Sequence, residues 1–121
     1  MIYTAESKAL ASLEDLIHVD AVDLLEDYVF IPVHIDEKLM HMLDVESLPP
    51  DWQKTPFSVS TQMIGDGWIS ENLYPVLGVP SAPIPGEKNY LLNPAHPDFG
   101  NLQMGAPEPF EFDLRLLKQG F

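Results

Sequence analysis

Glu14 is the residue whose position most strongly suggests chemistry, because it places a carboxylate on an apolar helix face. Residues 7–18 have helical spacing, with Leu10, Leu13 and Ile17 at intervals of three and four. Glu14 lies inside that apolar arc. Removing a carboxylate from water costs free energy unless a partner compensates. Two interpretations stay open: a glutamate at the edge of the arc that reaches water, and a carboxylate held at the floor of a cleft.

A second candidate is Ser81, which lies in the proline-rich segment 75–97. Six of the chain's twelve prolines fall in this segment, and two short apolar runs flank a turn rich in proline. This pattern predicts a β-hairpin with a rigid turn. Pro80 and Pro83 fix φ on either side of the serine, so its hydroxyl points in a set direction. An ordinary loop serine is the alternative interpretation.

Histidines offer little further chemistry. The four of them, at positions 18, 34, 41 and 96, show no H-x-x-x-H or other recognised ligand spacing, so we expect no metal site. A hydrolase built on Ser81 with a histidine base is a weak alternative, because the G-x-S-x-G elbow is missing from the sequence.

Charge and composition narrow the classes of partner. The 121 residues carry a net charge of −13, from 19 acidic and six basic side chains. Such a surface repels phosphate backbones, so we expect no direct binding of nucleic acid. A basic protein partner is compatible with it, as is a simple solvated acidic surface. The sequence has no run as long as a membrane span and no cysteine, which suits a cytoplasmic protein.

The elements that position these residues predict a single α+β domain with a small, mostly antiparallel sheet and packed helices. Ser7 is the candidate N-cap of the first helix. The other expected elements are a strand over 28–35 interrupted at Pro32, a short helix over 37–43, a packing anchor at Trp52, a helix over 61–74 and a strand over 109–116.

Taken together, these pieces resemble the RES domain family, named for an arginine, a glutamate and a serine. The matching segments are IYTAESKALASLEDLIHV at 2–19, Trp52, STQMIGDGW at 60–68, VPSAPIPGEKNYLLNPAHPDF at 79–99 and PFEFDLRL at 109–116. Their order and gaps agree over nearly the whole chain, so the resemblance does not depend on any single motif.

This resemblance implies a fold similar to ADP-ribosyltransferase toxins and an activity that consumes NAD⁺. It also implies a bacterial toxin that is neutralised by a cognate Xre-like antitoxin. By matching position, Glu14 is the family glutamate, Ser81 the family serine, and Tyr3 the aromatic residue that lines the nicotinamide-side pocket. Water or phosphate as the acceptor, and a macromolecular target, stay open. The oligomeric state also stays open, with a homodimer among the alternatives.

The family arginine has no counterpart in residues 1–121. In similar proteins it precedes the equivalent of Ile2, so we expect N-terminal strands that carry it to be missing from this chain. Arg115 is the only arginine and lies in the last matching segment, where it is no substitute. The competing hypothesis is therefore a catalytically inactive, truncated RES remnant that acts only as a binding partner.

Overall fold

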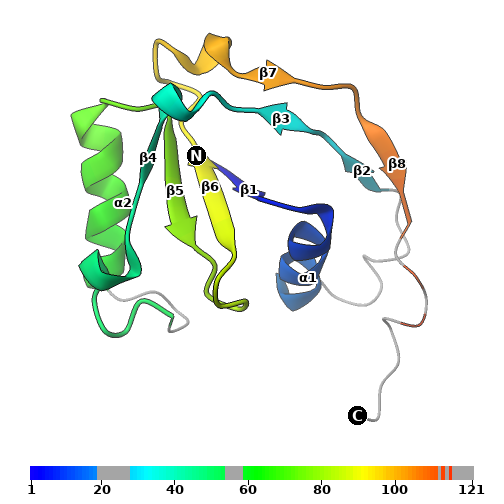
Figure 1. The fold of residues 1–121 in the computed structure, drawn as a ribbon, viewed down its shortest axis with the longest axis horizontal. Coiled ribbons are helices and arrows are strands. Elements are labelled where there is room, and N and C mark those ends of the chain that lie inside the picture. Colours follow the sequence, from blue (N-terminus) through cyan, green and yellow to red (C-terminus); the bar gives the residue numbers. More distant parts are fainter. Residues whose placement is uncertain (19–27, 54–58, 112, 114, 116–121) are drawn as a thin grey trace.

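A four-stranded sheet forms the centre of the computed structural model, which describes residues 1–18, 28–53, 59–111, 113 and 115. Its strands lie in the order β1 (Ile2–Ala5), β6 (Lys88–Leu92), β5 (Val76–Pro80) and β4 (Met40–Met42). The first two neighbouring pairs are antiparallel, and β4 is parallel to β5 (Figure 1). The predicted α+β class with a mostly antiparallel sheet is confirmed.

The expected hairpin is the middle of this sheet. β5 and β6 pair over their whole length, and the N–H of Ser81 closes the turn by donating to the carbonyl of Glu87 at 2.7 Å. Gly86 has φ +90°, a conformation that side chains with a Cβ rarely adopt. The proline-glycine turn therefore forms as its local sequence predicts.

Two helices, α1 (Lys8–His18) and α2 (Val59–Glu71), flank the sheet. The predicted cap of α1 is confirmed, since the N–H of Leu10 donates to Ser7 Oγ at 3.1 Å. Leu10 is buried, but Leu13 is 43% exposed, so its expected core position is wrong. α1 packs on β1 at the edge of the sheet, and Leu10 is the only fully buried residue among those of the helix whose burial is described.

The second helix matches the prediction over 61–74 in part. It begins at Val59 and ends at Glu71, where Asn72 takes φ +54° and turns the chain toward β5. Trp68 is buried against Leu77 and Leu91 and anchors the helix to one face of the sheet. Within the described part of the chain, no helix has both the length and the apolarity needed to span a membrane.

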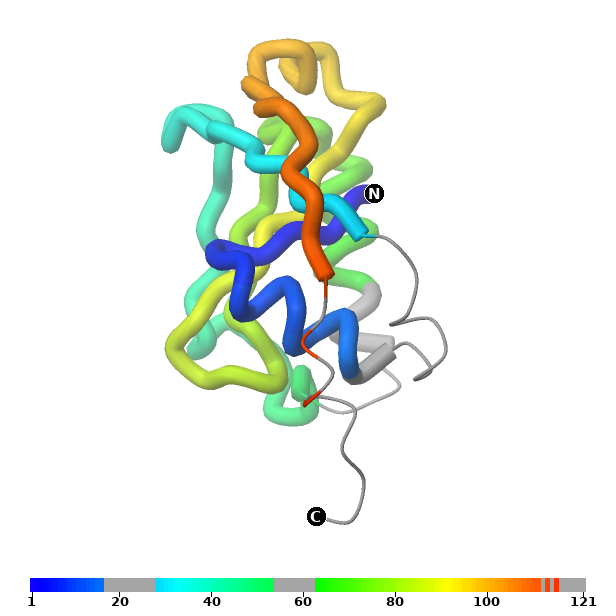
Figure 2. Tube along the Cα trace, turned by 90° about the vertical axis from the view of Figure 1, so that its right-hand side faces the viewer, coloured from blue at the N-terminus to red at the C-terminus, as the bar shows by residue number. Residues whose placement is uncertain are grey.

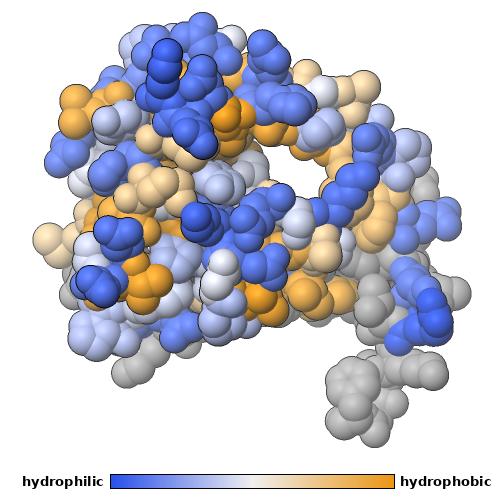
Figure 3. Space-filling view, viewed as in Figure 1, coloured by the Kyte–Doolittle hydropathy of each residue, from blue (hydrophilic) through white to orange (hydrophobic). Residues whose placement is uncertain are grey.

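The opposite face of the sheet carries a second core around Val76, Leu92 and Leu102. A two-stranded arm extends from it, in which β2 (Tyr28–Phe30) pairs with β8 (Glu108–Phe110) and β3 (Val33–His34) pairs with β7 (Gln103–Met104). In Figure 2 the arm passes in front of β1 on its way to α1. Figure 3 shows an opening between the arm and the sheet.

At the α1 end of the arm, Lys8 forms a salt bridge of 2.7 Å with Glu108 and lies over the ring of Phe30. The rings of Phe30 and Phe110 lie 4.4 Å apart. These contacts join the first helix to the last described strand.

Of three further expected elements, one is confirmed and two differ from the structure. The strand over 28–35 is split at Pro32, as its proline predicted. The short helix over 37–43 is wrong: a 3₁₀ turn at Glu37–Leu39, capped by Asp36, is followed by β4, because residues 40–42 pair with β5. The strand expected over 109–116 is confirmed at Pro109 and Phe110, where β8 ends, and is wrong at Glu111 and Asp113, which are not in a strand. The part of this prediction that falls on residues 112, 114 and 116 lies outside the described residues.

Candidate functional site

Glu14 is held by the side chain of Asn89. The amide nitrogen Nδ2 of Asn89 donates to both carboxylate oxygens, at 2.7 and 2.9 Å, and to the carbonyl of Thr4 at 3.1 Å. Asn89 lies on β6 directly opposite Ala5 of β1, and only 8% of it is exposed. The central sheet therefore fixes the donor, and the donor fixes the orientation of the carboxylate.

Ser81 completes the cluster from the hairpin turn. Its hydroxyl donates to Glu14 Oε1 over a long 3.4 Å and accepts the N–H of Ile84 at 3.3 Å. The residue is fully buried, and its neighbours Pro80 and Ala82, rather than Ser81 itself, line the adjoining cavity. The rigid turn thus directs this hydroxyl toward the carboxylate and away from open space.

A cleft of about 1000 Å³ opens beside the cluster. Residues of α1 and β1 line one wall, residues of α2 line another, and residues of β5 and β6 line the floor. Gly65 of α2 lines this cleft, and no atom lies within 4 Å of where its Cβ would stand. The volume exceeds what a single ring needs and is ample for a dinucleotide-sized ligand.

The charged side chains that line the cleft are acidic among the described residues. Glu14 and Asp15 project from α1 and Asp66 lies on α2, whereas no lysine or arginine lines the cleft among the described residues. Carboxylates grouped in this way favour a cationic ligand or a transition state that develops positive charge.

Two aromatic residues line the same cavity. Tyr3 is 65% exposed and pairs with Leu91 across the sheet, on the face that carries Leu77 and the cleft floor. Trp52, expected to be a packing anchor, is only half-buried and lines the cleft instead. Both rings offer a flat surface on which a planar or cationic ring can stack.

The structure thus brings together all three residues singled out from the sequence. Glu14 and Ser81 are in contact, and Tyr3 lines the cavity next to them. Asn89 was missed, although a sequence signal was present: it lies two residues before Leu91, so the pleat of the strand turns this polar side chain to the same face as that apolar one.

Arg115 lies outside the cleft-lining residues. Its guanidinium bonds to Asp113, with Nη2 2.6 Å from Oδ2 and Nε 3.0 Å from Oδ1. These exposed bonds lower the pKa of Asp113 and raise the pKa of Arg115. The arginine is therefore engaged in a local pair.

The ring of His96 is held by hydrogen bonds to the backbone. It is buried in a turn, with Nε2 2.9 Å from the carbonyl of Asn72 and Nδ1 accepting the N–H of Asp98 at 2.9 Å. This contact joins the segment after β6 to the end of α2 and uses both ring nitrogens.

Comparison with known proteins places this architecture in one family. The model of the RES domain matches residues 1–113. The chain therefore belongs to the RES domain family.

Curated relatives extend the match over nearly the whole chain. A protein named Toxin Res from Photorhabdus laumondii is 40% identical over 118 residues, which cover 97% of this chain and 76% of the relative. A Toxin Res from Yersinia enterocolitica is 34% identical over 95% of this chain and 76% of its own length. A Sphingobium protein named Prs ADP-ribosylating toxin is 27% identical over 98% of this chain and 76% of its own length.

The expectation that N-terminal strands are missing is not supported by these alignments. They cover nearly all of this chain and about three quarters of each relative, and they do not assign the remaining quarter to either end.

Proposed function

We propose that this chain is a RES-family toxin that cleaves the bond between nicotinamide and ribose in NAD⁺, and that a cognate Xre-like antitoxin neutralises it. The observation that carries the proposal is the Glu14 carboxylate, oriented by Asn89 at the wall of a cleft that also presents Tyr3. The toxin names of the relatives support it, and the Sphingobium name supports chemistry on ADP-ribose.

The reaction breaks the N-glycosidic bond, and its electron pair goes to the pyridinium nitrogen, which becomes neutral in the departing nicotinamide. Positive charge develops on the ribose ring in an oxocarbenium-like transition state. An oxygen of water or phosphate then bonds to the anomeric carbon and a proton is released. The products are nicotinamide and either ADP-ribose or its 1-phosphate.

Within this reaction Glu14 stabilises the positive charge on the ribose or orients its hydroxyls and the attacking oxygen. The acidic cleft favours both the pyridinium ring of the substrate and the oxocarbenium. Tyr3 stacks on the ring that leaves. These roles require the carboxylate to stay in one orientation while charge develops.

That requirement gives Asn89 and Ser81 their roles. Asn89 holds both oxygens of Glu14 through one amide group that the sheet immobilises. Ser81 supports the same carboxylate from the hairpin, and its burial favours action through Glu14 over direct contact with the substrate. Both are positioning residues in this proposal.

The proposal is tested by incubating the purified 121-residue chain with NAD⁺ and following nicotinamide release by chromatography. We expect release by the natural sequence and a loss of about 100-fold or more in Glu14→Gln. Glu37→Gln, an exposed carboxylate outside the cleft, is the matched control and should retain full activity. Runs with and without inorganic phosphate identify the acceptor from the product.

Intact NAD⁺ after incubation with the folded natural chain would contradict the proposal and favour the inactive binding partner. Transfer of labelled ADP-ribose to a protein, with little free ADP-ribose, would instead identify a macromolecular acceptor. Equal losses in Glu14→Gln and Glu37→Gln would remove the assigned role of Glu14.

A further inference from the structure

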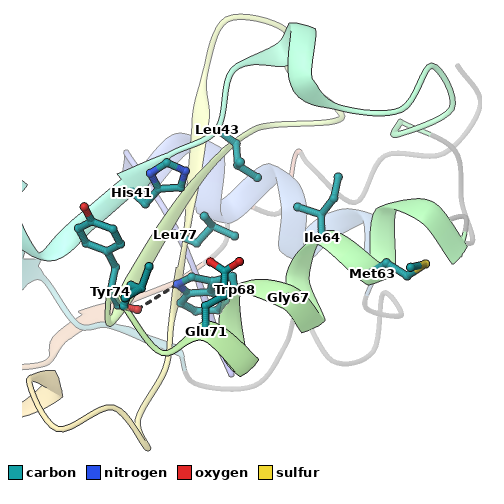
Figure 4. A pocket seen from close by; sticks show the side chains of 10 residues that line it. His41, Leu43, Met63, Ile64, Gly67, Trp68, Glu71, Tyr74 and Leu77 are labelled. Atoms are coloured by element: carbon teal, nitrogen blue, oxygen red, sulfur yellow. Dashed lines mark hydrogen bonds between the residues drawn. The ribbon is translucent and has the colours of Figure 1, made fainter.

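A groove of about 310 Å³ lies between strand β4 and helix α2 (Figure 4). His41 of β4 and Leu43, the residue that follows β4, form one wall, and Gly67 and Glu71 of α2 are part of the other. The groove adjoins the cleft, because Leu43, Ile64 and Leu77 line both.

The outer edge of β4 has backbone groups that could pair with a further strand. β4 is the last strand of the central sheet, and no described strand pairs with its outer edge. The N–H of Leu43 donates inward to the carbonyl of Gly78 at 2.9 Å. Because successive N–H groups of an extended strand point to opposite sides, the N–H of Met42 faces outward.

The groove is apolar at its ends and acidic on one wall. Met63 is 65% exposed and Leu73 is 69% exposed, which is high for large apolar side chains. The rings of His41 and Tyr74 are stacked with centroids 5.7 Å apart. Among the described residues, Glu71 is the only carboxylate that lines the groove, and Figure 4 shows it on the helix side, across from the two rings.

We propose that this groove binds an extended segment of a partner protein, which adds a strand to the free edge of β4. A strand in this position places alternate side chains between β4 and α2, where apolar residues fill the groove and a basic residue lies beside Glu71. The net charge of −13 favours such a basic partner through long-range attraction. This binding does not depend on cleavage of NAD⁺.

The test uses two blocked decapeptides of alternating threonine and valine, with either arginine or glutamate at one central position. We expect the arginine peptide to bind the full chain about fivefold or more tightly, as measured by fluorescence anisotropy. Binding should also slow hydrogen exchange at the amide of Met42. Glu71→Lys should abolish or invert the preference. Glu111→Lys makes the same charge change next to β8, and should preserve it.

Equal binding of the two peptides, or binding of neither, would overturn the proposal. So would unchanged exchange at Met42 in the complex, or an equal loss of preference in Glu71→Lys and Glu111→Lys. A chain that is already dimeric in sedimentation, with Met42 protected in the absence of peptide, would show that a second copy occupies the edge.

Discussion

Glu14 has an unusual environment for a helix carboxylate beside a cleft. Among the described residues its partners are an amide and a hydroxyl, so its charge is oriented there without a cationic partner. A salt bridge would neutralise the carboxylate within the protein, whereas neutral hydrogen-bond donors leave its negative charge free to interact with a ligand. The cluster therefore favours stabilisation of positive charge in the cleft.

Replacing Asn89 with alanine should lower kcat by about 10- to 100-fold with little change in KM, because the carboxylate loses its orientation and not its charge. The measurement is the rate of nicotinamide release. The double variant with Glu14→Gln should be no slower than Glu14→Gln alone. Asn93→Ala, another buried asparagine, is the control for general destabilisation. Additive losses in the double variant would refute the positioning role.

Replacing Ser81 with alanine should have a smaller effect on the rate, below about tenfold, because its bond to Glu14 is long. The same change leaves the Ile84 N–H without its acceptor and should lower the free energy of unfolding by about 1 kcal/mol. Steady-state kinetics and urea denaturation measure the two effects. A rate loss as large as that of Glu14→Gln would instead point to a direct contact between the hydroxyl and substrate.

At the scale of elements, the site depends on two features, the narrow buried face of α1 and the closed turn of the β5–β6 hairpin. The helix brings Glu14 to the sheet, and the hairpin supplies Asn89 from a strand and Ser81 from the turn. Each element can be tested separately from the chemistry, through its own contribution to stability.

Leu10→Ala should lower the free energy of unfolding by about 2–5 kcal/mol, because this side chain of α1 is only 1% exposed. Leu13→Ala, on the same helix but 43% exposed, should cost less than about 1 kcal/mol. Urea denaturation of both variants makes the comparison. Similar costs at the two positions would mean that α1 packs with a broader face than described.

Gly86→Ala should destabilise the chain by about 1–2 kcal/mol, since its φ of +90° strains any residue with a Cβ. Gly100→Ala is the matched control: it has open space around the added Cβ and no positive φ. Thermal unfolding of the pair separates strain from loss of flexibility. If both substitutions were neutral, the hairpin turn would have to adjust without cost.

For the whole molecule, the dominant physical property is its negative charge. Among the described residues the recorded salt bridges are Lys8 with Glu108 and Asp113 with Arg115, and both are exposed. Such pairs contribute little, so most acidic side chains repel one another across the surface. The fold must overcome this repulsion with its two apolar cores.

Salt should therefore stabilise the chain. Raising NaCl from about 20 mM to about 500 mM should increase Tm by several degrees, because the Debye length shortens and the repulsion is screened. Scanning calorimetry measures this directly. The rise should be smaller in Glu111→Lys, which removes one negative charge and adds one positive. A Tm that falls with salt would show that attractive pairs dominate instead.

The sequence by itself determined several local elements and marked one residue, Glu14, as out of place on an apolar helix face. The cap at Ser7, the proline-glycine hairpin and the break at Pro32 depend on neighbours a few residues away, and each formed as expected. A carboxylate inside an apolar arc already marked Glu14 as a residue that needed a partner.

Only the tertiary structure determined which residue is the partner of Glu14, namely Asn89. Asn89 lies 75 residues from Glu14 along the chain, and no local rule pairs them. The same holds for β4, whose residues appear helical alone but become a strand because β5 supplies a hydrogen-bonding edge. Burial of Ser81 and exposure of Leu13 likewise depend on which surface covers each residue. Spacing determines which side chains share a face, whereas long-range packing determines what that face meets.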